Sequence, residues 1–172
     1  MRLAVAEESP DYRERVFSIE PRPFTDPLAV RLIEELQEEY HARYGGSDKT
    51  PIEAREFDPP AGLFLVGLLD SDPVAAGGWR RLGPRVGEIK RMYVARRARR
   101  RGLSRLMLNR LESTLAADGY ERVVLMTGLA QPEAIALYES SGYLPGESYG
   151  PYAREPRARF YRKELRLELS RG

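Results

Sequence analysis

The sequence predicts a single mixed domain of the α/β or α+β class. Short stretches with the pattern of β-strands alternate with longer stretches whose apolar residues recur at helical spacing, and glycine and proline separate them. At 172 residues, one domain can remove roughly 70% of the unfolded chain's surface from water, which is enough for a core. An apolar share of 42% beside 31% charged residues is typical of a globular chain. We therefore expect residues 15–172 to form one domain, after an N-terminal extension of residues 1–14.

The first half of this domain is predicted to contain a strand, a helix and a hairpin. Residues 15–19 have a strand pattern that prolines then interrupt. Asp26 and Pro27 mark a helix start, because the carboxylate can cap free amides and proline suits the first helical position. An apolar residue then recurs at every fourth position until a pair of glycines. Residues 63–69 and 74–81 are two further strands, and the Asp-Ser-Asp-Pro segment between them indicates a hairpin.

The second half is predicted to alternate between strands and helices. Residues 86–94 form a strand, and leucines and a methionine at helical spacing indicate a helix from 103 to 115. The next strand, 122–127, should run parallel to 86–94, because a helix makes the crossover between them. A helix over 132–140 and a last strand over 160–167 complete the order.

Composition excludes several classes of site and partner. With no cysteine and one histidine, the chain has no disulfide, no cysteine nucleophile and no multi-histidine metal site, so we expect no metal. A formal charge of +2 from 28 basic and 26 acidic residues favours neither nucleic acid nor a membrane surface. Nothing approaches the ~20 apolar residues of a membrane span, and the apolar run at residues 3–6 is too short for a secretory signal. We expect a cytoplasmic protein.

One segment carries the pattern of an anion site. The strand at 86–94 leads into a loop crowded with arginine, then Gly102, then an amphipathic helix. Free amides and the positive end of the dipole at a helix start favour a phosphate, and glycine lets the backbone approach it. Arginine can add charge-assisted hydrogen bonds. The G-x-x-x-x-G-K-S/T and G-x-G-x-x-G patterns of other phosphate sites are absent from this segment.

Residues 99–104, R-R-R-G-L-S, resemble a known loop. The loop is the Gln/Arg-x-x-Gly-x-Gly/Ala pattern with which GNAT acetyltransferases hold the pyrophosphate of acetyl-CoA. Ser104 stands where the family prefers glycine or alanine. A strand ending in M-Y-V precedes the loop, as in the family. The resemblance implies acetyl-CoA as acyl donor, bound by Met92, Tyr93, Val94, Arg99, Arg100, Arg101, Gly102, Leu103 and Ser104.

A second motif strengthens this resemblance. Residues 131–143, Q-P-E-A-I-A-L-Y-E-S-S-G-Y, are similar to the family's Asn-x-x-Ala-x-x-x-Tyr-x-x-x-Gly-Phe/Tyr pattern. Gln131 replaces the usual asparagine and is expected to contact the cofactor, and Tyr138 matches the family's general acid for the leaving thiolate. The implied fold is one GNAT-type domain whose mixed sheet splays at its centre, with helices on both faces. The implied reaction is direct attack of an amine on acetyl-CoA.

The chemistry also calls for a base and an oxyanion donor. An alkyl amine is free base in only about one molecule in 2,500 at pH 7, so a proton acceptor helps. Glu88, eleven residues before Arg99, has the spacing of the glutamate base in histone-acetylating family members. It lies roughly 13 Å along the strand from Met92, which favours a water relay, and a structural ion pair is the alternative. The family's oxyanion donor is a backbone amide at a bulge, which would fall within residues 92–94.

Several features have simpler interpretations beside the functional ones. The arginines of residues 96–101 also fit a nucleic-acid patch or a solvated loop, and the acidic residues at 34–39 fit a solvated helix face paired with arginines four residues away. The loop at 149–152 is a candidate wall of the acceptor site. The expected function is acetylation of a small-molecule primary amine. The alternatives are a protein lysine or N-terminal acetyltransferase and an idle acetyl-CoA-binding module, and a homodimer stays open.

Overall fold

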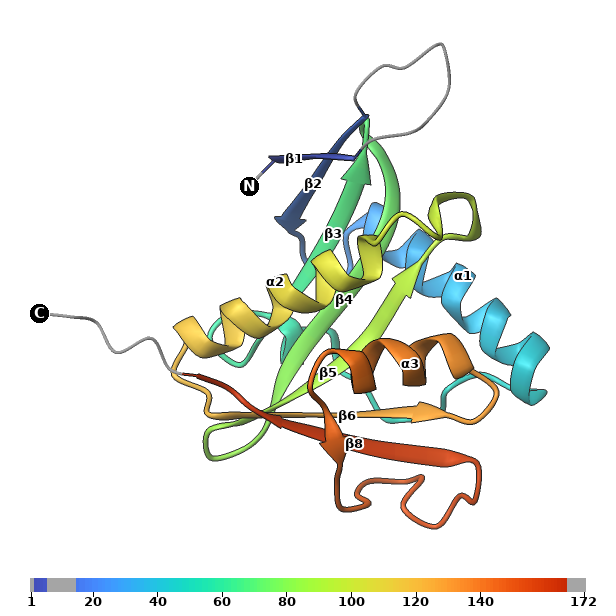
Figure 1. Ribbon diagram of the computed structural model, residues 1–172, viewed down its shortest axis with the longest axis vertical. Helices are drawn as coiled ribbons and strands as arrows, with labels where there is room; N and C mark the ends of the chain where they lie inside the picture. The colour runs from blue at the N-terminus through green and yellow to red at the C-terminus, as the bar shows by residue number, and fades with distance from the viewer. Residues whose placement is uncertain (1, 6–14, 167–172) are drawn as a thin grey trace, which may run out of the picture.

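The chain folds around one mixed sheet. The computed structural model describes residues 2–5 and 15–166, and eight strands follow the order β1-β2-β3-β4-β5-β6-β8-β7 (Figure 1). The pairing of β5 with β6 is parallel and every other pairing in the described sheet is antiparallel. The strands are β1 (Arg2–Val5), β2 (Arg15–Pro21), β3 (Gly62–Leu69), β4 (Asp72–Gly83), β5 (Val86–Val94), β6 (Arg122–Gly128), β7 (Leu144–Pro145) and β8 (Ala158–Glu164). The helices are α1 (Pro27–Tyr44), α2 (Leu103–Ala117) and α3 (Pro132–Ser140), with short 3-10 turns η1 (Ala54–Phe57) and η2 (Arg96–Ala98).

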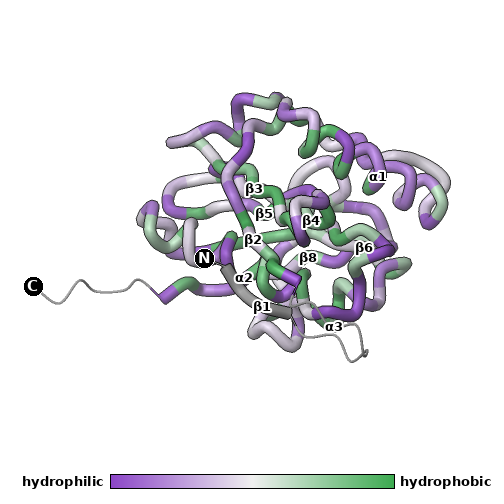
Figure 2. Tube along the Cα trace, turned by 90° about the horizontal axis from the view of Figure 1, so that it is seen from above, coloured by the Kyte–Doolittle hydropathy of each residue, from purple (hydrophilic) through white to green (hydrophobic). Residues whose placement is uncertain are grey.

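The helices lie on both faces of the sheet. Figure 2 shows α1 on one side of the central strands and α2 and α3 on the other. Helix α1 begins as predicted, because the Asp26 carboxylate accepts a hydrogen bond from the Leu28 amide at 2.9 Å and Pro27 follows it. It ends at Gly45, which adopts the left-handed conformation. None of the helices within residues 15–166 combines the length and the hydropathy needed to cross a bilayer.

The predicted hairpin joins β3 to β4. Asp70 and Ser71 form a two-residue loop in which both residues have positive φ, 50° and 69°, between the paired residues Leu69 and Asp72. Positive φ at both central positions is the geometry of a type I′ turn, whose twist matches that of the flanking strands. The hairpin places β4 beside β5 at the centre of the sheet.

Helix α2 packs closely onto β4 and β5. Its apolar stripe, Leu103, Met107, Leu111 and Leu115, is fully buried. A Cβ on Gly87 would lie 2.4 Å from Leu115 Cδ2, so a larger residue there would force the Leu115 side chain to move. On β4, the indole of Trp79 is completely buried and donates a hydrogen bond to Thr114 Oγ1 at 3.0 Å. These contacts fix the C-terminal end of α2 against β4 and the start of β5.

The sheet opens between β5 and β6. Their parallel pairing covers Val86 to Glu88 against Arg122 to Val124, and beyond this point the two ribbons diverge (Figure 1). The pairing of β4 with β5 also shifts, because Ala76 faces Tyr93 while Gly78 faces Lys90, which leaves one extra residue on β5. This β-bulge contains Arg91 with φ of 57°. The predicted mixed sheet, splayed at its centre with helices on both faces, is confirmed.

The element boundaries differ from the predicted ones mainly at the edges of the sheet. The last strand was expected over 160–167 and instead occupies 158–164, because it follows the register of its neighbour β6. Strands β1 and β7 were not predicted. Residues 2–5 belong to the expected N-terminal extension, yet β1 pairs with β2, and strands of two to four residues are too short to show a period. The remainder of that extension lies outside the described residues.

Candidate active site

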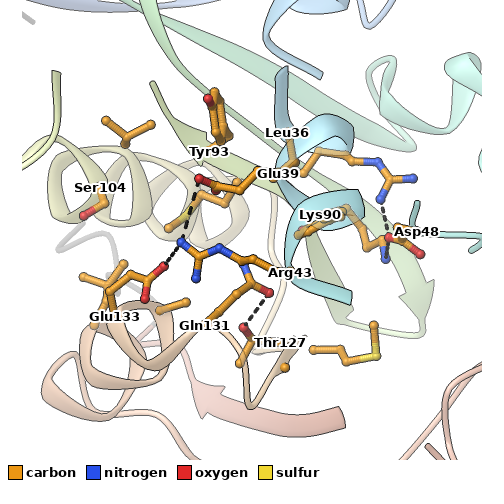
Figure 3. Close-up of a pocket in the computed structure, with 18 of the residues that line it drawn as sticks. Leu36, Glu39, Arg43, Asp48, Lys90, Tyr93, Ser104, Thr127, Gln131 and Glu133 are labelled. Atoms are coloured by element: carbon orange, nitrogen blue, oxygen red, sulfur yellow. Dashed lines mark hydrogen bonds and ion pairs between the residues drawn. The ribbon is translucent and has the colours of Figure 1, made fainter. Parts of the chain in front are cut away.

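A cavity of about 540 Å³ lies where β5 and β6 part. Its walls come from α1, the bulged end of β5, the start of α2, the end of β6, α3 and the loops around residues 46–48 and 152–158. Figure 3 shows side chains from these elements converging on one space, with Ser104 and Glu133 on one side and Asp48 and Lys90 on the other. The cavity therefore has two distinct ends.

The first end is built by the turn that starts α2. Arg100 and Gly102 both have positive φ, 64° and 75°, and Gly102 is the N-cap of the helix. The first backbone amides of α2 have no hydrogen-bond acceptor within the helix, as at the start of any α-helix. The helix dipole adds partial positive charge at the same end. Arg100, Gly102, Leu103 and Ser104 line the cavity, whereas Arg101 lies outside the lining. The predicted anion site thus faces the cavity.

Arg99 connects this turn to α1. Its guanidinium donates hydrogen bonds to both oxygens of the Glu39 carboxylate, at 2.8 and 3.0 Å, and to the Val94 carbonyl at 2.9 Å. It also lies 5.7 Å above the centre of the Tyr93 ring. Arg99 lines the cavity, and these contacts, made through its Nε and Nη2, hold the turn against α1.

Two other arginines of the predicted cluster also contact acidic groups. Arg97 bonds to Asp72 at 3.0 Å and Arg96 lies 3.5 Å from Glu39. Glu39 is buried, whereas the sequence analysis placed it on a solvated helix face. The predicted pairing of Glu39 with Arg43, four residues on, is present at 3.8 Å. Acidic neighbours reduce the free positive charge that a nucleic-acid patch would need.

The bulge of β5 exposes backbone to the cavity. Met92, Tyr93 and Val94 all line it, and the register shift leaves Arg91 and Met92 without direct partners on β4. The Met92 side chain points to the α2 face, near Gly77, while the Tyr93 hydroxyl donates to Glu35 of α1 at 3.3 Å. An amide freed by a bulge is a fixed donor for an oxygen that gains charge. The unpaired residues overlap the predicted stretch 92–94 at Met92 and extend it by one residue to Arg91.

Tyr138 and Gln131 bring α3 to the cavity. Both residues line it. Tyr138 is buried and contacts Tyr143 and Tyr161 at ring distances of 5.6 and 6.2 Å. Burial raises the pKa of its phenol, so the group carries its proton at neutral pH. The Gln131 side-chain oxygen accepts hydrogen bonds from the Tyr44 hydroxyl at 3.1 Å and from Thr127 at 3.4 Å, the second of which Figure 3 shows.

Glu88 lies away from the cavity wall. It is buried, and its carboxylate accepts a hydrogen bond from Arg80 Nε at 2.9 Å. Arg80 in turn donates to Glu56 at 2.9 Å and to the Pro51 carbonyl at 3.0 Å. Tyr149 lies beside this pair, and burial together with the Glu88 carboxylate raises the pKa of its phenol. Glu88 is absent from the residues that line the cavity, which favours the ion-pair interpretation.

The structure adds polar side chains that sequence reasoning missed. Arg43 joins α1 to α3, because it pairs with Glu133 at 2.5 Å (Figure 3). It also donates to the carbonyl of Ala130, in the loop before α3, at 2.7 Å. At the other end, Asp48 pairs with Lys90 at 3.2 Å and also with Arg91. The adjacent Lys90 and Arg91 were a visible signal in the sequence. Regular strand alternation would have placed them on opposite faces, and only the bulge brings them together.

Comparison with known proteins agrees with this geometry. The model of the acetyltransferase (GNAT) family matches residues 29–143. An IAA acetyltransferase of Azospirillum brasilense is 31% identical over 144 residues, which cover 83% of this chain and 94% of that protein. An uncharacterized N-acetyltransferase of Bacillus subtilis (strain 168) is 35% identical over 123 residues, covering 62% of this chain and 82% of that protein.

Solved structures share the fold. A protein named as an acyl-CoA N-acyltransferase, from Klebsiella pneumoniae, superposes with a TM-score of 0.73 at 25% identity, covering 87% of this chain and 98% of that one. A GNAT family acetyltransferase from Elizabethkingia anophelis with acetyl-CoA bound gives a TM-score of 0.63 at 15% identity, covering 87% and 98%. The second likeness concerns the fold alone.

A mixed sheet that opens onto a helix N-terminus, with a phosphate-type turn at one end of the opening, defines an acyl-CoA-dependent acyltransferase. The family match covers well over half of the chain. The protein belongs to the GNAT acetyltransferase family and is an acetyl-CoA-dependent acyltransferase.

Proposed function

We propose that this enzyme acetylates the primary amine of a small molecule, with acetyl-CoA as acyl donor. The observation that supports a small acceptor is a link between two loops at the second end of the cavity. The Lys49 amide donates a hydrogen bond to the Tyr152 hydroxyl at 2.8 Å, which joins the loop after α1 to the loop before β8. Asp48 and Tyr152 line the cavity beside this link. A protein chain would need an open groove at this position.

The residues present fit acetyl-CoA. The turn at Arg100 and Gly102, with the first amides of α2, would hold the pyrophosphate, and Ser104 is small enough for close approach. The gap between β5 and β6 would take the pantetheine arm, and Gln131 and Ala134 of α3 line its far side. When bound, acetyl-CoA supplies an activated acetyl thioester. The side chains and amides of this chain then orient the amine and manage charge and protons.

Two groups of the chain carry the proposed chemistry. The amides at the β5 bulge, Arg91 to Val94, would donate to the thioester oxygen as it gains negative charge. The Tyr138 phenol, kept protonated by burial, would give its proton to the leaving thiolate. Glu88 would act as base only through a relay, because Arg80 holds its carboxylate outside the cavity lining.

A panel of amines tests this proposal. The enzyme is mixed with acetyl-CoA and each of a set of small amines, lysine-containing peptides and peptides with free N-termini, and thiol release is measured. We expect the highest kcat/KM with a small amine. A preference for peptides would favour a protein acetyltransferase. Tight acetyl-CoA binding without thiol release from any amine would favour a binding module, and either result would overturn the proposal.

A further inference from the structure

The acceptor end of the cavity contains two buried cations beside one carboxylate. Lys90 and Arg91 are 7% and 8% exposed, and both line the cavity. Lys90 Nζ lies 3.2 Å from the Asp48 carboxylate and 3.3 Å from the Thr50 hydroxyl. Arg91 bonds to the same Asp48 oxygen through one of its terminal nitrogens. Among the charged residues that line this end, formal positive charge therefore exceeds formal negative charge by one, and burial lowers the pKa of Lys90 while the Asp48 carboxylate raises it.

Arg91 retains unused donor capacity. Its Nε is buried and has no hydrogen-bond partner among the described residues. A guanidinium presents five N–H donors in a planar fork, and leaving a buried donor unmatched is unfavourable. A group that accepts hydrogen bonds and carries negative charge would remove this cost. The unmatched donor points to a ligand at this position.

The neighbouring acidic groups do not balance the excess charge. Glu88, two residues before Lys90, is bonded to Arg80 and lies outside the cavity lining. Tyr40 lines the cavity but stays neutral, because burial and the nearby Asp48 raise the pKa of its phenol. Glu155 also lines the cavity, and it pairs with Arg157 at 3.2 Å. Asp48 is therefore the counter-ion that Lys90 and Arg91 share.

The bulge creates this arrangement. Along a regular strand, consecutive side chains point to opposite faces. The extra residue in β5, with Arg91 at φ of 57°, lets Lys90 and Arg91 both reach Asp48. Positive φ is unfavourable for a residue with a side chain, so the backbone at Arg91 is strained. This strained conformation accompanies the pairing of Lys90 and Arg91 with Asp48. In Figure 3, Lys90 and Asp48 lie across the cavity from Ser104, away from the phosphate turn.

We propose that Lys90 and Arg91 bind a carboxylate of the acceptor, so the substrate class is a small molecule that carries both an amine and a carboxylate, such as an amino acid. One net positive charge matches one carboxylate, whereas a phosphate carries more negative charge than this end would neutralise. The cations also place the acceptor by its acid group and leave its amine free to reach the bulge. This inference rests on the proposed function.

Pairs of acceptors that differ in the charge of one group test the proposed carboxylate subsite. Each amino acid in a series of increasing chain length is compared with its own carboxamide, which keeps the amine and the size but lacks the charge. We expect the wild-type enzyme to prefer the best carboxylate over its amide by at least about tenfold in kcat/KM, because the amide leaves the buried cations unmatched. A phosphonate analogue of the same amine is the third acceptor, and we expect it to react more slowly than the carboxylate.

Variants assign the preference to these residues. Arg91→Met and Lys90→Met should each reduce the ratio between carboxylate and amide severalfold or more, and Arg91→Lys should keep part of it. Arg154→Met, which removes an exposed cation from the loop next to Tyr152, should leave the ratio unchanged. Stabilisation of the wild-type protein against heat by the amino acid alone, and its loss in Arg91→Met, gives a readout independent of turnover. If Arg91→Met does not fold, the wild-type ratio alone decides.

The outcomes separate the two proposals. Thiol release with amides as efficient as with amino acids, and unchanged by Arg91→Met, would overturn the carboxylate subsite while the amine acetyltransferase stands. A better rate with the phosphonate would also overturn it. Failure of every small amine would overturn the proposed function itself. If Lys90 and Arg91 only fasten the Asp48 loop, their variants would lower the melting temperature and leave the acceptor ratio unchanged.

Discussion

At the scale of single residues, the Tyr138 phenol is the clearest candidate for a chemical role. It lines the cavity, and burial raises its pKa, so it carries the proton that a leaving thiolate needs at neutral pH, although a raised pKa also makes it a weaker acid. We predict that Tyr138→Phe lowers turnover by about 10² or more, within the usual range for loss of a general acid. Acetyl-CoA affinity, measured by calorimetry, should stay within about twofold because the ring remains.

Tyr143 offers a matched control for this substitution. Its ring packs against that of Tyr138 and is buried, but it is outside the cavity lining. Tyr143→Phe should therefore retain nearly full turnover. A large loss in Tyr143→Phe together with full activity in Tyr138→Phe would reassign the proton donor.

Glu88 differs from Tyr138 because an ion pair already accounts for its burial. We predict that Glu88→Gln lowers stability by on the order of 2 kcal/mol, since Arg80 loses a buried partner but keeps Glu56 and a carbonyl. The loss of turnover should be the same at every pH, and urea denaturation beside a pH profile of kcat/KM measures both effects. A loss that shrinks as pH rises toward the pKa of the amine would instead identify Glu88 as the base.

Sequence patterns could predict some of these residues and not others. Gly102 and Tyr138 stand in motifs whose spacing is set within one local segment, and the structure places both at the cavity. The pairing of Arg99 with Glu39 joins segments 60 residues apart and depends on how α1 crosses the sheet. Lys90 and Arg91 were hidden because a bulge reverses the alternation that strand reasoning assumes.

At the scale of elements, the turn into α2 combines a backbone requirement with an expected anion. Gly102 has φ of 75°, and no atom lies within 4 Å of the position a Cβ would take. Gly102→Ala therefore adds only backbone strain, about 1–2 kcal/mol. Gly102→Glu adds the same strain together with bulk and a negative charge at the phosphate site.

The two variants therefore separate folding from binding. We predict that Gly102→Ala and Gly102→Glu lose similar stability in thermal denaturation, while calorimetry finds acetyl-CoA affinity reduced within about tenfold in the first and by more than about 100-fold in the second. Gly119→Ala, at the opposite end of α2 with φ of 86°, controls for strain alone. Undiminished affinity in a folded Gly102→Glu protein would place the pyrophosphate elsewhere.

The elements themselves were largely predictable because local signals agreed with tertiary packing. The cap at Asp26 and the buried stripe of α2 each have a local pattern, and the structure shows both. The hairpin turn at Asp70 and Ser71 falls within the Asp-Ser-Asp-Pro segment that predicted a hairpin. The edge strands β1 and β7 have no such pattern, because their partners define them.

At the scale of the whole molecule, the site depends on a sheet that is incomplete at its centre. Strand β5 pairs with β4 along its length but with β6 over three residues only, so the cavity occupies the place of the missing ladder. Side-chain contacts link the elements on either side of the gap, where β5 and β6 do not form backbone hydrogen bonds. Arg43 ties α1 to α3 on one side of the gap, and Asp48 ties the loop after α1 to β5 on the other.

The contribution of Asp48 to the stability of the folded protein should decrease in acid. Burial alone would raise its pKa, but Lys90, Arg91 and hydrogen bonds from Thr50 outweigh burial and hold the pKa of the carboxyl well below its usual range. A group whose pKa is lowered by folding contributes stability above its unfolded pKa, near 4, and that stability is lost as pH falls toward the folded value. Asp48→Asn removes the charge at every pH. We predict that it lowers the free energy of unfolding by on the order of 3 kcal/mol at pH 7, since two buried cations lose their partner.

The difference in the free energy of unfolding between wild-type and Asp48→Asn proteins should then narrow as the pH falls below about 4, because the Asp48 carboxyl of the unfolded wild-type chain takes up a proton that folding must release. Urea denaturation at pH 7, 5 and 3 measures this difference in the free energy of unfolding. Asp58→Asn, at an exposed aspartate, should change stability by less than about 0.5 kcal/mol at each pH. Saturating amounts of the amino acid acceptor should enlarge the loss of stability in acid for the wild-type protein, because binding of its carboxylate is added to the folded state above pH 4. A constant difference across the three pH values would show that the ion cluster around Asp48 does not govern the acid stability of the molecule.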